Sequence, residues 1–348
     1  MPTIMPRYPH TTPPAPGAVL EVAPDILWLR MPLPFALDHI NLWLLRDTDG
    51  YVLVDCGHGD KATRTLWEHH FRTTLRDLPI TRILVTHHHP DHLGNADWLM
   101  QRFACPLSMT ATEFLMAHAI FHSCPPFTAE ATFALFRTHG TEAEDIAVFA
   151  ERAHLYQAGV PSPPARHHRL NSGTVGTIDI DTNPWHVIIG QGHTPEHASF
   201  YTPAKKLLIS GDMLLPKIST HISIWPFEPE SDPLLHFLDS LAPIAALPDN
   251  TLVLPSHGLP FYGISERVAQ LREHHEERLS DLREILRLSP RPLCAAEIFP
   301  QLFLRELDVH QRFFAISETI AHLNHLWLLH ETERHIDSDG IIRFSLAL

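Results

Sequence analysis

Residues 80–92 read ITRILVTHHHPDH, an apolar run that leads directly into histidines and an aspartate. The run is rich in β-branched residues, which favours a strand. A tight loop after a strand end directs its side chains into one small volume, and imidazole and carboxylate groups together suit zinc. The pattern H-x-H-x-D-H therefore predicts a metal site formed by His87, His89, Asp91 and His92.

Three further polar residues also follow apolar runs. His193 follows WHVII in the sequence GQGHT, Asp212 follows KKLLIS in SGD, and His257 follows TLVL in PSHG. Each has a glycine close by, where the backbone can turn closely around a ligand. In this order along the chain, they predict that several strand ends supply ligands to one metal site.

The motifs LVDCG, THHHPDH, GQGHT, SGD and PSHG resemble those of the metallo-β-lactamase superfamily, over roughly residues 19–258. The resemblance implies an α/β protein with an αββα sandwich and a two-metal site on one edge. It assigns the first metal to His87, His89 and His193, the second to Asp91, His92 and His257, and a bridging position to Asp212. Asp55 of LVDCG is then expected to support the ligand loop without binding metal.

The motif set looks closest to glyoxalase II, lactonase and related hydrolases. The second metal position has Asp91 and His92 where many true β-lactamases have cysteine ligation. The resemblance implies two Zn²⁺ per chain, although manganese or iron could occupy the same ligands. Two such ions lower the pKa of a bound water to about 7, so that a bridging hydroxide can attack an ester, thioester or lactone carbonyl. Asp91 and Asp212 could also assist proton movement.

Two other functions share this fold and stay open. One is a mononuclear iron dioxygenase, which the complete second set of ligands argues against. The other is a metal-dependent nuclease or phosphodiesterase. Lys and Arg number 26 against 40 Asp and Glu, a net charge of −14, which is the wrong sign for gripping phosphate backbones. We therefore expect a small-molecule substrate and no nucleic-acid partner.

The chain divides into three expected parts. Residues 1–17 form a proline-rich lead-in, extended or disordered. Residues 18–262 form the catalytic domain, with a helical insert at about 111–159. Residues 263–348 form a mostly helical region before a DSDG turn, similar to the winged-helix-like tail of some relatives. This tail includes an amphipathic helix over 265–288, and it could pack on the sandwich or form a homodimer.

The composition predicts the cellular compartment of the protein. Four dispersed cysteines with no CxxC pair predict reduced thiols in a cytoplasmic protein. No apolar run approaches the ~18 residues that a membrane-spanning helix needs, so we expect no membrane association.

Substrate contacts are less well specified. Lys217 and His221 follow Asp212 closely and could enter the metal cleft, with a solvent-facing lysine and a structural histidine as the alternative. His197 could contact substrate or support a ligand. The insert is long for a connection and holds six phenylalanines, so it could form a lid that receives an apolar acyl group. Phe121 and Phe133 are the expected contacts there, and packing on the sandwich is the alternative.

The sequence also predicts where three further histidines lie. His88 lies between two expected ligands and should point away from the metals. His274 and His275 lie in a charged helical segment and are expected at the surface.

Overall fold

Two β-sheets face each other in the computed structural model, which describes residues 6–171 and 176–347. The first sheet has seven strands in sequence order. They are β1 (Leu20–Ala23), β2 (Ile26–Pro32), β3 (His39–Asp47), β4 (Gly50–Val54), β5 (Ile80–Leu84), β6 (Leu107–Met109) and β7 (His168–Arg169). The strands β1 to β4 pair antiparallel, and β4 to β7 pair parallel.

The second sheet has five strands in the order β12-β11-β10-β9-β8. They are β8 (Thr177–Ile180), β9 (Asn183–Gly190), β10 (His197–Thr202), β11 (Leu207–Gly211) and β12 (Leu252–Pro255). Among its described strands, only β11 and β12 pair in parallel, so both of these strands end at the same edge of the sheet.

Side-chain alternation explains why these strands are apolar throughout. Val52 and Val54 of β4 lie in the cluster between the two sheets, whereas Leu53 faces the outer helices. Likewise Leu207 of β11 faces the first sheet and Leu208 faces outward. Because both faces of each sheet are covered, the strands read as continuous apolar runs.

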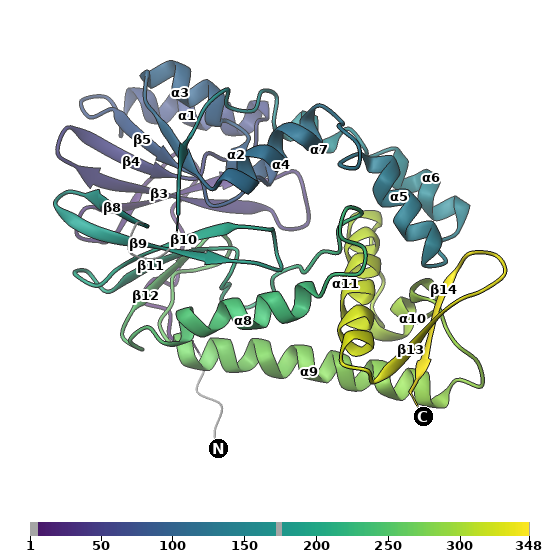
Figure 1. Ribbon diagram of the computed structural model, residues 1–348. Helices are drawn as coiled ribbons and strands as arrows, with labels where there is room; N and C mark the ends of the chain where they lie inside the picture. Colours follow the sequence, from purple (N-terminus) through teal and green to yellow (C-terminus); the bar gives the residue numbers. More distant parts are fainter. Residues whose placement is uncertain (1–5, 172–175, 348) are drawn as a thin grey trace.

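Helices cover the outer face of each sheet (Figure 1). They are α1 (Lys61–Arg72), α2 (Pro90–Leu93) and α3 (Ala96–Phe103) on the first sheet, and α8 (Pro233–Ala245) and α9 (Ile264–Leu288) on the second. Helix α1 begins where the Asp60 carboxylate accepts the backbone N–H of Thr63 at 2.8 Å. This arrangement is the expected αββα sandwich, and the fold prediction is confirmed.

The expected insert consists of four helices. They are α4 (Ala111–Phe121), α5 (Ala129–Thr138), α6 (Ala143–Ala150) and α7 (Leu155–Gly159). In Figure 1, α4 and α7 lie beside the sandwich, and α5 and α6 lie beside the C-terminal helices. The Phe136 ring of α5 is 5.1 Å from that of Phe313, so the insert joins the two parts of the molecule.

The C-terminal region packs on the sandwich through a shared core. It continues from α9 with α10 (Ala295–Leu302), α11 (Val309–Leu328) and the hairpin of β13 (Thr332–Ile336) and β14 (Ile342–Leu346). Ile264 and Val268 of α9 belong to the same buried cluster as Val253 of β12. Helices therefore dominate as expected, but the segment before the DSDG turn is a strand because it pairs with β14.

The described part of the N-terminal lead-in is anchored. The backbone of Arg7 exchanges two hydrogen bonds with that of Tyr262, at 3.0 and 2.9 Å. Residues 1–5 lie outside the described residues. Within the described ranges, no helix is long and apolar enough to cross a membrane.

Candidate metal centre

Loops and the short helix α2 at one edge of the sandwich carry all seven expected metal ligands. His87 follows β5, and His89 immediately precedes the short helix α2 that contains Asp91 and His92. The other three follow strands of the second sheet: His193 follows β9, Asp212 follows β11, and His257 follows β12. The two sheets thus supply ligands from opposite sides of one edge.

The first group of ligand atoms belongs to His87, His89 and His193. Nε2 of His87 lies 2.9 Å from Nδ1 of His89 and 3.3 Å from Nε2 of His193. Two nitrogens bound at 2.0–2.1 Å to a tetrahedral zinc ion lie roughly 3.4 Å apart. The three histidines therefore fit one ion.

The second group belongs to Asp91, His92 and His257. Oδ2 of Asp91 lies 3.5 Å from Nε2 of His92 and 3.4 Å from Nε2 of His257. One ligand atom from each of the three residues lies within 4.8 Å of the others. This nitrogen and oxygen set also fits one divalent cation.

Asp212 reaches both groups with different oxygen atoms. Its Oδ2 lies 3.5 Å from Nε2 of His193 in the first group. Its Oδ1 lies 3.6 Å from Nε2 of His92 and 3.4 Å from Nε2 of His257 in the second group. A carboxylate placed in this way can bridge two cations.

Hydrogen bonds on the outside of the centre orient the imidazole rings. Nδ1 of His193 donates to the carbonyl of His221 at 2.8 Å, and Nδ1 of His257 donates to that of His39 at 2.7 Å. These bonds fix the tautomer in which Nε2 keeps its lone pair toward the centre.

Asp55 makes the contacts expected of a supporting residue. Its carboxylate accepts the backbone N–H of Thr86 at 2.8 Å and contacts Nδ1 of His92 at 2.8 Å. Its backbone has φ 61°, a left-handed conformation that aspartate tolerates better than most residues. This turn places the carboxylate beneath the loop that starts at His87.

The charges of the centre call for a cation. Burial would raise the pKa of Asp212, but the charges of His257 and His92 lower it well below its usual range. Burial would lower the pKa of His257, but the charge of Asp212 and further contacts raise it to about 10. Within the described residues, Nε2 of His92 and Oδ1 of Asp212 are buried without a hydrogen bond. Divalent cations would replace the attracted protons and satisfy these atoms, so the residues present fit a pair of metal ions.

Comparison with known proteins agrees with this geometry. Residues 36–257 match the family model described as the metallo-beta-lactamase superfamily. The chain belongs to this superfamily. Residues 282–347 match a second model, the metallo-beta-lactamase-like C-terminal domain. The superfamily assignment from the motifs is confirmed.

Two solved structures resemble almost the whole chain. A crystal structure of a Beta-lactamase domain protein from Burkholderia ambifaria has a TM-score of 0.90 and 43% identity, and the match covers 98% of each chain. A metallo-beta-lactamase family protein from Thermus thermophilus has a TM-score of 0.77 and 30% identity, over 94% of this chain and 100% of its own.

Two relatives known from their sequences carry hydrolase names. The Probable metallo-hydrolase YqjP of Bacillus subtilis (strain 168) is 24% identical, over 86% of this chain and 91% of its own. The Hydroxyacylglutathione hydrolase of Rhodobacter capsulatus is 26% identical, over 75% of this chain and 78% of its own. This chain is therefore a metallo-hydrolase of the metallo-beta-lactamase superfamily. It has clusters of histidine and aspartate that could bind metal.

The other residues singled out from the sequence lie in different places. Lys217 is exposed, and its amino group lies 6.0 Å from the centre of the Tyr8 ring. His197 is buried, and its Nε2 accepts the backbone N–H of Asp212 at 3.1 Å. His197 thus holds the backbone of Asp212 in place, and Lys217 faces solvent.

The two insert phenylalanines differ in burial. Phe133 is only 4% exposed and belongs to the core cluster that includes Phe136 and Phe149. A side chain in that cluster contacts its protein neighbours, so Phe133 belongs to the core and not to a substrate pocket. Phe121 is half-buried at the end of α4.

His88 points to a partner outside the candidate centre. Its backbone N–H donates to Glu113 at 3.0 Å, and its ring forms an ion pair with the same carboxylate. Burial would raise the pKa of Glu113, but the charge of His88 and several hydrogen bonds lower it to about 2. This buried pair fixes the loop between the first two histidines, and nothing in the local sequence singles out Glu113.

Helix α11 brings aromatic side chains to the centre that the sequence does not reveal. The His310 ring stacks 5.2 Å from that of Phe35 and lies 4.5 Å from that of Phe314. The Phe314 ring is also 4.4 Å from that of His221. Burial chiefly lowers the pKa of His310 to about 4. Because the carbonyl of His221 accepts from Nδ1 of His193, the aromatic wall of Phe35, His310 and Phe314 lies beside the segment that supports this expected ligand.

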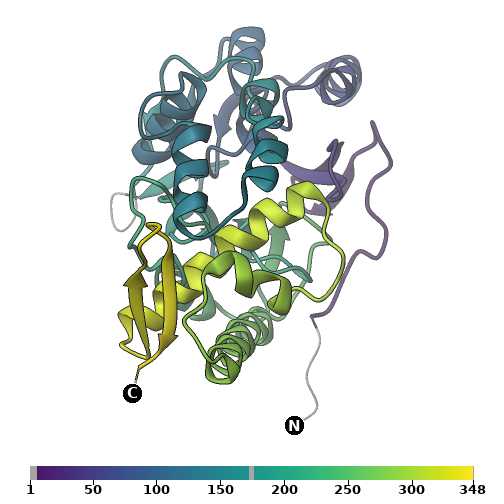
Figure 2. The same cartoon turned by 90° about the vertical axis from the view of Figure 1, so that its right-hand side faces the viewer.

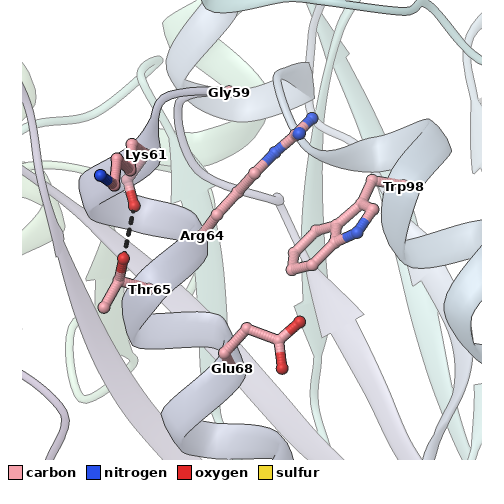
Figure 3. Close-up of a pocket in the computed structure, with 6 residues that line it drawn as sticks. All are labelled: Gly59, Lys61, Arg64, Thr65, Glu68 and Trp98. Atoms are coloured by element: carbon pink, nitrogen blue, oxygen red, sulfur yellow. Dashed lines mark hydrogen bonds between the residues drawn. The ribbon is translucent and has the colours of Figure 1, made fainter.

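A separate pocket lies between α1 and α3. Its volume is about 390 Å³, and it is lined by Gly59, Lys61, Arg64, Thr65, Glu68 and Trp98 (Figure 3). The Arg64 guanidinium lies 5.3 Å from the centre of the Trp98 ring. None of the expected ligands lines this pocket, so we do not place the chemistry there.

Proposed function

We propose that the chain is a dinuclear zinc hydrolase that cleaves an ester, thioester or lactone bond of a small, partly apolar substrate. One observation carries the proposal: the two oxygens of Asp212 face two separate groups of metal-type ligands. His87, His89 and His193 would hold one ion, and Asp91, His92 and His257 the other. When bound, such ions supply a water of lowered pKa and a Lewis acid for the carbonyl oxygen.

The protein side chains have three roles in this proposal. Asp212 holds the two ligand groups at a fixed separation. Asp91 has a carboxylate oxygen beside both His92 and His257, and it can accept a proton from the attacking water or pass one to the leaving group. Asp55, through Thr86 and His92, keeps the ligand loop in place.

The wall formed by Phe35, His310 and Phe314 supports an apolar acyl group as part of the substrate. These side chains are half-buried, so their rings keep surface that a substrate can cover. Ligand pockets are mostly apolar with a few placed polar groups, and the carboxylates and imidazoles of the centre would be those groups. The name Hydroxyacylglutathione hydrolase, carried by several relatives, favours a thioester within this class.

A substrate screen with the zinc-loaded full chain tests this function. The panel contains thioesters, lactones, aryl esters, phosphodiesters and β-lactams. We expect turnover of thioesters, lactones or esters that is lost in Asp212→Ala. Turnover confined to phosphodiesters, or oxygen consumption with an iron-loaded protein, would replace this proposal with a phosphodiesterase or a dioxygenase.

A further inference from the structure

A second cluster of metal-type side chains, distinct from the seven expected ligands, lies between α9 and α11. It consists of His274 and His275 of α9 and Glu318 of α11. One ligand atom from each residue lies within 4.8 Å of the others, as in the three groups of the main centre. The expectation that these histidines lie at the surface is wrong for His275, which is fully buried.

The hydrogen bonds around His275 leave one of its nitrogens free. Nδ1 of His322 lies 2.8 Å from the carbonyl of Glu318, so Nδ1 carries the hydrogen and Nε2 of His322 is an acceptor. Nε2 of His322 therefore accepts from Nδ1 of His275, at 3.1 Å. The remaining nitrogen of His275, Nε2, has a lone pair, is buried and makes no hydrogen bond within the described ranges.

A neutral histidine with this hydrogen-bond pattern can bind a metal ion through its free nitrogen. A histidine that binds metal usually donates its other N–H to a fixed acceptor, which sets its tautomer and ring orientation. His322 supplies that acceptor to His275, as the carbonyl of His221 does for His193 in the main centre. A buried imidazole lone pair with no partner otherwise costs free energy.

Glu318 supplies the negative charge. Its side chain is 13% exposed, and its Oε2 lies 3.8 Å from Nδ1 of His221. Both ring nitrogens of His221 are buried without a hydrogen bond in the described part of the chain. No lysine or arginine pairs with Glu318 among the described ion pairs, so imidazoles are the groups that surround this carboxylate.

The charge states of the cluster suit a cation. Burial, with the nearby His322, lowers the pKa of His275 to about 3, so its ring is neutral. Burial would raise the pKa of Glu318, but the contact with His221 and the charges of His322 and His275 lower it to about 2. Metal ions require deprotonated ligands of this kind.

We propose that His274, His275 and Glu318 bind one additional divalent cation of the zinc type. Imidazole and carboxylate ligands match zinc, and His221 lies beside the carboxylate at the distance of a neighbouring ligand. The ion would link α9 to α11. Figure 2 shows α11 passing obliquely between the insert helices and α9, and contacts of α11 with both α6 and α9 agree with that view. The site is independent of the catalytic proposal.

Metal content of the full chain tests the additional site. The variants are His274→Ala and Glu318→Gln, because His275 is fully buried and its replacement could prevent folding. Exposed His236 of α8 gives the matched control His236→Ala. Each protein is saturated with zinc, passed through a desalting column and analysed for zinc per chain, and zinc-loaded crystals are examined by anomalous diffraction.

We expect each variant to hold one zinc equivalent fewer than the wild type and the His236→Ala control. The anomalous map of the wild type should show a peak between His274, His275 and Glu318 that His274→Ala lacks, with the main centre unchanged. Equal zinc content in the wild type and both variants, or a wild-type map without that peak, would overturn the proposal. Neither result depends on the substrate or on catalytic activity.

Discussion

Asp55 shows how one residue outside the ligand set can control metal affinity. Its carboxylate holds Nδ1 of His92 and the backbone of Thr86. In Asp55→Asn the left-handed backbone stays accessible, because asparagine also tolerates positive φ, but the charge is lost. We expect zinc affinity to fall about 10–100-fold in a competition titration with a chromophoric chelator.

Asp25 provides the matched control for this experiment. It also has a positive φ, of 70°, but it lies at the surface in an ion pair with Lys205. Asp25→Asn should bind zinc like the wild type. Unchanged affinity in Asp55→Asn would contradict the supporting role of this carboxylate.

His139 should make the stability of the protein sensitive to acid. Burial, followed by the charge of Arg334, lowers its pKa from 6.5 to about 3. The unfolded chain therefore binds a proton as the pH falls below 6.5 while the folded protein does not, so stability is present above that pH and is lost below it. From about pH 7.5 to about pH 5, this one residue lowers the free energy of unfolding by about 2 kcal/mol.

The replacement His139→Phe keeps a ring next to Phe344 and removes the titration. Urea unfolding at the two pH values should show a loss of stability about 2 kcal/mol smaller in this variant than in the wild type. His236→Ala should lose as much as the wild type. An identical pH dependence in His139→Phe would show that this residue does not titrate on unfolding.

Local sequence predicts the candidate ligands better than the residues around them. The expected ligands are histidines and aspartates in the short segments that follow apolar runs, and this local pattern can be recognised without knowing the fold. His310 and Phe314 have no such pattern, because they reach the centre only when α11 packs across the molecule. The same reason applies to His275: its neighbours on α9 are charged, but α11 covers this position.

At the scale of elements, the insert is largely structural. Phe133 of α5 is buried in the core cluster. Phe133→Ala should therefore lower the free energy of unfolding by about 3–5 kcal/mol, measured by urea denaturation, and leave the preference for acyl length unchanged. The exposed Leu115 of α4 gives the control, since Leu115→Ala should change stability little. A stable Phe133→Ala protein with an altered acyl preference would instead show that Phe133 contacts the substrate.

Helix α11 should determine acyl preference in place of α5. Each methylene buried against its aromatic wall adds about 0.8 kcal/mol, roughly fourfold in affinity. In a short homologous series of esters or thioesters, kcat/KM should rise with acyl length for the wild type. Phe314→Ala should flatten this trend and leave zinc content unchanged. If kcat/KM of the wild type did not depend on acyl length, the aromatic wall would not be part of the binding site.

Elements with strong local patterns were predictable, and those that depend on distant partners were not. The amphipathic helix expected over 265–288 is Ile264–Leu288 in the structure. Strand β13, with the sequence TERHI, has little apolar alternation, and its pairing with β14 makes it a strand. The insert helices α5 and α6 share a buried core with the C-terminal region, and this contact between distant parts of the chain has no local sequence pattern.

At the scale of the whole molecule, three buried clusters among residues 6–171 and 176–347 set the position of the centre. One lies between the sheets and one lies between each sheet and its outer helices. The outer cluster of the second sheet extends through α9 to α11, so the C-terminal region is held firmly against the sandwich. This shared core brings His310 and Phe314 of α11 close to loops that carry the expected metal ligands, although these loops lie far from α11 in the sequence.

Anomalous diffraction from zinc-loaded crystals tests the central claim, that Asp212 bridges two metal ions. We predict two peaks at the main centre about 3.5–4 Å apart, one on each side of the Asp212 carboxylate. One should lie among His87, His89 and His193, and the other among Asp91, His92 and His257. In Asp212→Ala at least one peak should be lost, together with hydrolytic activity. A single peak at the main centre of the wild type, under saturating zinc and with full activity, would contradict the account.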